Sequence, residues 1–223
     1  MSREKEVPLI WLIAGEPSGD LIGARLIVAL RERSGGNVRI AGIGGEAMLE
    51  EGLESLFPIS DIAVMGLIEI IPRVPLIKRR MRETISRIES DRPDIVVSID
   101  VPGFCYDIWK GLRGSDIPLV HYVAPTVWAW RPDRAKKFAA ELDYLMTLLP
   151  FEPPYFEKEG LDTTFVGHPV LEGNAGNGAG AAFRVAHDIR PDQTVVSVLP
   201  GSRRGEIRKL LSVFRSASTR IVE

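Results

Sequence analysis

The chain has 223 residues, a formal net charge of −2, and ordinary shares of hydrophobic (45%) and charged (26%) residues. A net charge this close to zero gives no overall positive potential that would indicate binding to nucleic acid. The single cysteine, Cys105, excludes an internal disulfide framework and fits a reducing compartment. No run of about 18 apolar residues occurs, so we expect any membrane contact to be peripheral.

Apolar runs and helical periodicities alternate along the first 170 residues. The apolar runs predict strands at residues 7–13, 38–41, 95–99, 119–123, 144–149 and 163–166, with a further candidate at 53–57. Helices are predicted between them at residues 18–33, 46–51, 74–89, 104–113, 133–142 and 153–159. This alternation is typical of an α/β fold in which helices cover both faces of a parallel sheet, with ligands at the carboxyl ends of the strands.

The first predicted strand runs into a loop of small and acidic residues at 14–20. Ser18, Gly19 and Asp20 are interpreted as the cap of the next helix, whose free N–H groups make the loop ready for an anion. Glu16 is unusual in a loop that only cradles phosphate. We therefore interpret Glu16 as holding a sugar hydroxyl or orienting another side chain.

Asp100 directly follows the predicted strand at 95–99. Catalytic carboxylates lie at this position in open parallel sheets, but an aspartate that caps a helix or forms a turn is an equally good interpretation. His168 lies near the end of the alternating region, where a structural and a functional role are equally favoured.

The loop at 121–131 contains two tryptophans and several polar groups. His121, Trp128 and Arg131 are the candidate binding residues, because aromatic rings and a guanidinium can form a wall for a sugar or an acyl chain. The alternative is that the tryptophans pack under the loop and that His121 belongs to the core.

The segment at 62–82 is more apolar than one amphipathic helix face requires, and cations follow its apolar residues. Pro72 and Pro75 prevent one continuous helix. Such a segment suits a peripheral membrane site, because apolar groups insert and cations attract anionic headgroups. A helix with a buried apolar face and solvated charges is the alternative. The candidate membrane contacts are Leu67, Ile68, Ile71, Val74, Leu76, Ile77, Lys78, Arg79 and Arg80.

The composition changes at residue 171, after which residues 172–182 are rich in Gly, Asn and Ala and are typical of a linker. A strand is then predicted at 194–199, a turn with Ser202 and Arg203 suited to a diphosphate, and a helix from residue 204. A helix cap with exposed arginines is the alternative for this turn. One strand and one helix cannot bury a core. We therefore expect an N-terminal domain at 1–170, a linker at 171–192, and the start of an incomplete second domain at 193–223.

Six segments, at residues 14–20, 98–104, 121–131, 149–152, 166–169 and 199–203, together resemble the lipid-A-disaccharide synthase family. The resemblance implies a GT-B glycosyltransferase with two Rossmann-like domains, of which the second is only begun here. It implies transfer of a diacylglucosamine unit from UDP-2,3-diacylglucosamine to 2,3-diacylglucosamine 1-phosphate in lipopolysaccharide biosynthesis. UDP is released with inversion at the anomeric carbon, and neither a metal nor another cofactor is expected.

The resemblance also implies roles for the candidate residues. Asp100 matches the general base that activates the acceptor hydroxyl, while Ser202 and Arg203 match groups that steady the UDP diphosphate. The resemblance further implies that the acceptor side of the cleft is lined by Glu16, Ser18, His121, Trp128 and Arg131. The segment at 62–82 matches the region of the family that meets the membrane. The resemblance therefore implies a cytoplasmic protein that lies peripherally on the cytoplasmic face of the inner membrane. It also allows a homo-oligomer.

Two departures from the family pattern matter. Gly103 stands where the family often has a second aspartate, which weakens mechanisms that need paired carboxylates. The uridine-binding residues of the family have no counterpart in the sequence, so we expect the chain to be inactive alone. Two alternatives remain: another UDP-sugar GT-B enzyme, such as a cell-wall glycosyltransferase or an epimerase, or a non-catalytic membrane-associated binding module.

Overall fold

The computed structural model describes residues 7–63, 71–172, 177–201 and 204–222. The chain divides into two compact units, unit 1 from Met1 to Gly173 and unit 2 from Asn174 to Glu223. Among the described residues, no helix combines the length and the hydropathy that crossing a bilayer requires.

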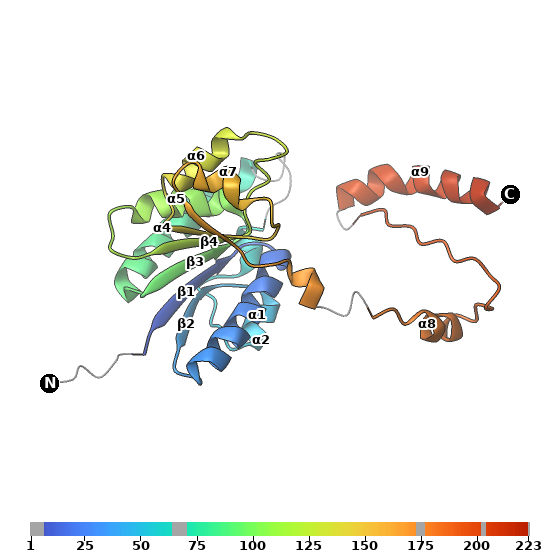
Figure 1. Ribbon diagram of the computed structural model, residues 1–223, viewed down its shortest axis with the longest axis horizontal. Coiled ribbons are helices and arrows are strands. Elements are labelled where there is room, and N and C mark those ends of the chain that lie inside the picture. Colours follow the sequence, from blue (N-terminus) through green and yellow to red (C-terminus); the bar gives the residue numbers. More distant parts are fainter. Residues whose placement is uncertain (1–6, 64–70, 173–176, 202–203, 223) are drawn as a thin grey trace. The chain divides into compact units, whose positions relative to one another are not determined.

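Unit 1 is built on one sheet of six parallel strands in the order β2-β1-β3-β4-β5-β6 (Figure 1). The strands are β1 (Leu9–Ala14), β2 (Arg39–Ile43), β3 (Ile95–Ile99), β4 (Leu119–Tyr122), β5 (Tyr144–Thr147) and β6 (Asp162–Phe165). The helices are α1 (Pro17–Ser34), α2 (Glu46–Glu50), α4 (Val74–Asp91), α5 (Pro102–Leu112), α6 (Asp133–Ala139) and α7 (Pro153–Glu157). The 3-10 turns in the described part of this unit are η1 (Ile59–Asp61), η2 (Ile71–Arg73) and η3 (Pro169–Glu172).

Two hydrophobic clusters lie on opposite faces of this sheet. Trp11 of β1 packs in a cluster with Ile88 of α4 and Trp109 of α5, whereas the next residue, Leu12, packs in the other cluster with Ile27 of α1. Successive side chains of a strand point to opposite faces, so β1 is apolar on both sides and its sequence is a continuous apolar run. The expected α/β fold with helices on both faces is confirmed (Figure 1).

The order of the strands places a switch point between β1 and β3. From β1 the chain crosses through α1 to β2 on one side, while β3 lies on the other side of β1. Ala14 and Ile99, the last residues of β1 and β3, are paired in register. Open α/β sheets bind ligands outside the carboxyl ends of the strands at such a point. The residues that follow Ala14 and Ile99 are therefore the first place to look for a site.

The further strand proposed at 53–57 is wrong, because only Ser55 makes an isolated bridge, to Gly42. Leu53 and Phe57 are buried as the sequence suggests, but the Ser55 hydroxyl donates to the Phe57 carbonyl and accepts from the Gly44 N–H. These local hydrogen bonds compete with a strand ladder and turn the backbone.

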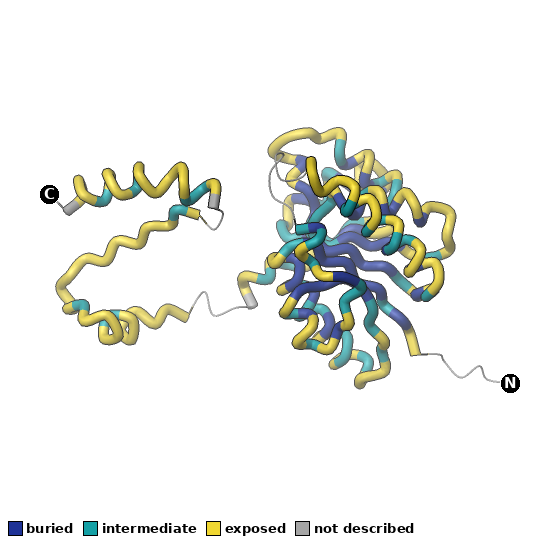
Figure 2. Tube along the Cα trace, turned by 180° about the vertical axis from the view of Figure 1, so that it is seen from behind, coloured by how far each residue is buried: buried dark blue, intermediate teal, exposed yellow. Residues whose placement is uncertain are grey.

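Unit 2 contains two helices, α8 (Gly180–Ala186) and α9 (Arg204–Val222), in its described part. The helix predicted from residue 204 is confirmed, and most of its residues are exposed (Figure 2). The strand predicted at 194–199 is wrong, because these residues carry no strand assignment and are exposed. A strand is stabilised by ladder bonds to a neighbour, and the described residues of unit 2 provide no neighbouring strand.

Candidate active site

Asp100 and Ser18 meet at the switch point of the sheet. The Ser18 hydroxyl donates to Asp100 Oδ2 at 3.0 Å, and the backbone N–H of Val101 donates to Asp100 Oδ1 at 2.9 Å. Each carboxylate oxygen therefore has a donor, and the carboxylate is held in one orientation. A half-buried carboxylate at this position can accept a proton from a hydroxyl brought to it.

The backbone at Asp100 adopts a conformation that most residues avoid. Asp100 has a φ of 55° and Val101 a φ of 48°, and a β-branched residue such as valine is a genuine outlier there. Each such residue costs of order 1–3 kcal/mol and persists only where its surroundings enforce it. Here the backbone N–H of Asp100 donates to the backbone carbonyl of Tyr122 at 2.9 Å, and the carbonyl of Val101 accepts hydrogen bonds from the N–H groups of Phe104 and Cys105.

The same geometry bears on the interpretation of Asp100 as a helix cap. Val101, not Asp100, is the N-cap residue of α5, and no side chain caps that helix. The Asp100 carboxylate bonds only the adjacent N–H of the α5 end and turns instead toward Ser18 of α1. Its contacts therefore link two strand ends and do not have the form of a helix cap.

Two glycines allow α1 to begin against the end of β3. A Cβ at Gly19 would lie 3.0 Å from the carbonyl oxygen of Ile99, and a Cβ at Gly15 would lie 2.9 Å from the Val101 side chain. Real Cβ contacts are rarely this short. Glycine at both positions thus permits the close approach that brings Ser18 to Asp100.

The predicted cap of α1 is wrong in its details. Glu16 occupies the N-cap position without a capping bond from its side chain, and Ser18 is already inside the helix. Asp20 is buried and caps a different helix: its carboxylate accepts the N–H groups of Gly45, Ala47 and Met48 at the start of α2. Asp20 therefore has a structural role. Glu16 is half-buried in the loop between β1 and α1.

A groove of about 340 Å³ opens beside Asp100 within unit 1. Arg25 of α1 donates to the carbonyl of Pro169 at 2.6 Å, and the N–H of Val170 donates to His168 Nδ1 at 3.1 Å. His168, for which the sequence leaves a structural and a functional role open, lines the same groove as Asp100. The groove is lined by Ser18, Leu21, Ile22, Arg25, Asp100, Val123, Leu148, His168, Pro169 and Val170.

The loop after β4 carries an exposed aromatic group. Trp128 donates its indole N–H to Glu152 at 3.3 Å and meets the ring of Phe151 edge-on at 5.3 Å. The Arg131 guanidinium lies over the exposed ring of Trp130 at 4.7 Å. Both tryptophans are exposed, so the alternative prediction that they pack under the loop is wrong.

His121 requires a correction. The sequence made it a substrate contact, but its side chain is fully buried in β4, with Nδ1 2.8 Å from the Ser98 hydroxyl and the ring of Trp109 4.8 Å away. Burial lowers the pKa of His121 to about 3, so the ring is neutral at physiological pH. A side chain enclosed in this way cannot touch a substrate, and the core interpretation applies.

The candidate membrane segment is divided by the structure. Ile71 and Val74 are exposed, as are Lys78 and Arg79, whereas Ile77 packs against the core. Leu76 is half-buried. Leu67 and Ile68 lie outside the described residues.

Arg80 is the exception among the predicted membrane cations. Its guanidinium pairs with Asp61 and Glu83, at 2.6 Å each, and lies over the ring of Phe57. Both carboxylates raise the pKa of Arg80, with Glu83 the larger cause. These contacts hold the Arg80 guanidinium against its own protein, so Arg80 is a poor candidate for binding a lipid headgroup.

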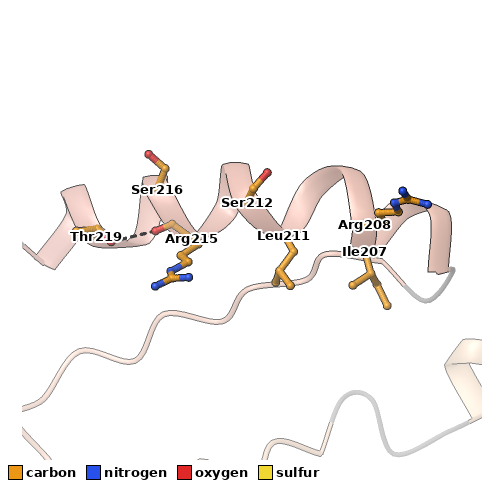
Figure 3. Close-up of a pocket in the computed structure, with 7 residues that line it drawn as sticks. All are labelled: Ile207, Arg208, Leu211, Ser212, Arg215, Ser216 and Thr219. Atoms are coloured by element: carbon orange, nitrogen blue, oxygen red, sulfur yellow. Dashed lines mark hydrogen bonds between the residues drawn. The ribbon is translucent and has the colours of Figure 1, made fainter.

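The predicted diphosphate residues, a metal site and a second hollow remain to be placed. Ser202 and Arg203 lie outside the described residues. Across the described ranges, no group of three or more His, Cys, Asp or Glu side chains is placed to hold a metal ion. A hollow in unit 2 shares no residue with the Asp100 groove and is lined by one helix alone, with Ile207, Arg208, Leu211, Ser212, Arg215, Ser216 and Thr219 of α9 (Figure 3).

Comparison with known proteins links this geometry to a family. A sequence model of the family described as Lipid-A-disaccharide synthetase matches residues 10–223. The Lipid-A-disaccharide synthase of Rhodospirillum centenum is 57% identical over 208 residues, covering 92% of this chain and 52% of the relative. That of Paramagnetospirillum magneticum is 59% identical over 208 residues, covering 92% and 53%. The chain thus spans about half the length of these curated relatives.

Solved structures with a similar fold are distant in sequence. The UDP-GlcNAc 2-epimerase from Neisseria meningitidis bound to UDP-GlcNAc has a TM-score of 0.60 at 12% identity, covering 95% of this chain and 63% of that chain. A putative UDP-N-acetylglucosamine 2-epimerase from Listeria monocytogenes has a TM-score of 0.56 at 14% identity, covering 92% and 65%. At these identities the likeness concerns the fold alone, and it agrees with the expected GT-B class.

Proposed function

Because the chain belongs to the Lipid-A-disaccharide synthetase family, we propose that residues 1–170 carry the acceptor side of an inverting glycosyltransferase. The reaction transfers a diacylglucosamine unit from UDP-2,3-diacylglucosamine to 2,3-diacylglucosamine 1-phosphate and releases UDP. The observation that supports this most directly is the Asp100 carboxylate, held at the switch point of the sheet by Ser18 and the Val101 N–H.

In the proposed step Asp100 is the general base. A sugar hydroxyl is a poor nucleophile until its proton is accepted in the transition state. The proton passes to Asp100 while the hydroxyl oxygen forms its bond to the anomeric carbon of the donor. The bond from that carbon to the UDP oxygen breaks with its electron pair, and attack from the opposite side inverts the configuration.

The roles of the other candidates follow from their positions. Ser18 donates to Asp100 Oδ2, so we assign it to orienting the base and no longer to binding the acceptor. Glu16, Trp128 and Arg131 remain candidates for the acceptor sugar, since exposed aromatic rings offer a flat apolar surface. Ser202 and Arg203 are assigned to the UDP diphosphate from the family resemblance, with donor binding beginning at residue 193.

The exposed part of the 62–82 segment supports a peripheral membrane site, which we assign to the cytoplasmic face of the inner membrane from the family resemblance. Ile71 and Val74 offer apolar groups, and Lys78 and Arg79 offer cations on the same helical stretch. Both proposed substrates are acylated, so an enzyme that acts on them benefits from lying on the lipid surface. Assembly into a homo-oligomer stays a prediction.

Transfer activity tests the proposal. Residues 1–223 would replace the matching part of the Rhodospirillum centenum relative, and radiolabelled sugar would be followed from the acylated UDP-sugar to the acceptor. Asp100→Asn should lower the rate by roughly 10²–10⁴-fold, the usual contribution of a general base. Asp107→Asn, on the exposed side of the same helix α5, is the control and should retain the rate. Full activity of Asp100→Asn would contradict the mechanism.

A UDP-sugar epimerase is the second candidate, favoured by the fold of the solved structures. Incubating the same chimera with UDP-GlcNAc and analysing the sugar would detect the epimer. We expect none, because the proposed reaction joins two sugars and leaves their other carbons unchanged. Binding of acylated sugars without turnover would instead support the non-catalytic binding module.

A further inference from the structure

We propose that the groove beside Asp100 binds an acyl chain of the acceptor. The inference rests on the proposed function, because it takes Asp100 as the base that activates the acceptor hydroxyl. It adds a subsite that selects acylated over unacylated acceptors, and it assigns that subsite to particular residues of unit 1.

The walls of the groove are apolar and come from distant parts of the chain. Leu21 of α1 is 61% exposed and Val170 of η3 is 53% exposed, and both line the same hollow. Ile22, Val123 and Leu148 complete its apolar lining. Large side chains left open on two walls of one groove indicate a ligand that covers them, since scattered single exposures would not share a hollow.

The two walls are tied together. Arg25 of α1 donates to the carbonyl of Pro169, 144 residues further along the chain, at 2.6 Å. The Val170 N–H donates to His168 Nδ1, which fixes the turn that carries Val170. The groove is therefore formed within unit 1 and does not depend on how unit 2 is placed.

The lining of the groove combines polar and apolar groups. Asp100 and Ser18, which are joined by a hydrogen bond, line it together with Arg25, His168 and the apolar residues of α1 and η3. A ligand that fits must place a hydroxyl next to a carboxylate and a hydrocarbon chain a short distance away. A bare sugar or a nucleotide would leave Leu21 and Val170 exposed to water. An acylated sugar matches both parts, because burial of its methylene groups in the groove is favourable.

The position of Asp100 decides which substrate the groove serves. The base takes its proton from the acceptor, so the groove that Asp100 lines lies beside the acceptor and not beside the leaving UDP. A volume of about 340 Å³ is at the small end of the usual range for ligand sites. It therefore suits one chain and not both acyl chains of the acceptor.

Binding to residues 1–223 tests the subsite without turnover. A soluble short-chain analogue of 2,3-diacylglucosamine 1-phosphate would be compared with glucosamine 1-phosphate by calorimetry. We expect the acylated compound to bind more tightly, and Leu21→Glu to weaken it about tenfold while leaving glucosamine 1-phosphate unchanged. Val170→Glu, on the opposite wall, should act in the same way. Leu49→Glu is the matched control, because Leu49 is 49% exposed on α2 and does not line the groove.

The outcomes separate this inference from the proposed function. If Leu21→Glu and Val170→Glu leave the acyl preference intact, while Asp100→Asn abolishes transfer in the chimera, the groove has no such role and the enzyme assignment stands. If the chimera transfers no sugar, the proposed function fails, whatever the groove binds. Equal loss with Leu49→Glu would show a general effect of the added charge and would also overturn the inference.

Discussion

The hydroxyl of Ser18 lies 3.0 Å from Oδ2 of Asp100, although 82 residues separate the two in the sequence. Ser18 belongs to the first turn of α1 and Asp100 follows β3, so their contact joins the ends of two neighbouring parallel strands. This relationship makes Ser18 a positioning residue for the proposed base, and it leads to the first prediction.

Ser18→Ala should lower kcat of the chimera by about tenfold or more while leaving KM for the acceptor near its original value. A hydrogen bond to a charged group contributes about 1.5–3 kcal/mol, and its loss frees the carboxylate to rotate. Ser18→Thr retains the hydroxyl and should restore most of the rate. Steady-state kinetics in both substrates would show the split; a raised KM with unchanged kcat would return Ser18 to direct acceptor binding.

Gly19→Ala should destabilise the chain by about 1–3 kcal/mol, because the new Cβ meets the backbone carbonyl of Ile99 at 3.0 Å. Gly103→Ala is the matched control, since a Cβ there meets nothing within 4 Å and Gly103 also lies in a helix. It should be neutral or stabilise slightly, as alanine favours helix over glycine. Urea denaturation of both variants would measure the difference, and equal stability would show that α1 can move away from β3 at little cost.

His121 makes stability depend on pH in a defined direction. Its folded-state pKa of about 3 lies below the usual value near 6.5, so the unfolded chain binds a proton that the folded chain does not. The stabilising effect is complete above about pH 6.5 and is lost as the pH falls toward 3. Between pH 7 and pH 5 this single group should lower the free energy of unfolding by roughly 2 kcal/mol.

His121→Phe removes that titration and keeps an aromatic ring beside Trp109. The pH 7 to pH 5 loss of stability should therefore be smaller in the variant by about the same roughly 2 kcal/mol. Chemical denaturation of the two proteins at both pH values gives the comparison. An identical pH dependence would mean that His121 can be protonated in the folded state.

Membrane binding should depend on the exposed residues of η2 and α4. Replacing Ile71 and Val74 with serine should weaken co-sedimentation with anionic liposomes, since apolar insertion is lost. Val28→Ser on α1 is the control, because Val28 and Val74 are both 37% exposed. Lys78→Gln with Arg79→Gln should weaken binding by about 10–30-fold at low salt, at about 1 kcal/mol per charge. Unchanged sedimentation of all these variants would refute the membrane site.

Much of unit 1 was predictable from local pattern. The apolar run at Ile95–Ile99 predicts a strand with the observed ends, and the same run identifies Asp100 as a strand-end carboxylate. Burial on both faces of a parallel sheet leaves a continuous apolar run, and that run is a local property of the chain. Strands whose existence depends on a partner were predicted less well, as residues 53–57 and 194–199 show.

Local patterns along the chain are enough to predict the α/β alternation, the family resemblance and the position of Asp100 at a strand end. Four long-range contacts are visible only in the folded chain: Ser18 donates to Asp100, Asp20 caps α2, His121 is enclosed in the core, and Arg25 joins α1 to Pro169. These contacts could not be predicted because they join segments brought together by the order of strands in the sheet. Periodicity along the chain reports which residues are buried, but it carries no information on which distant segment buries them.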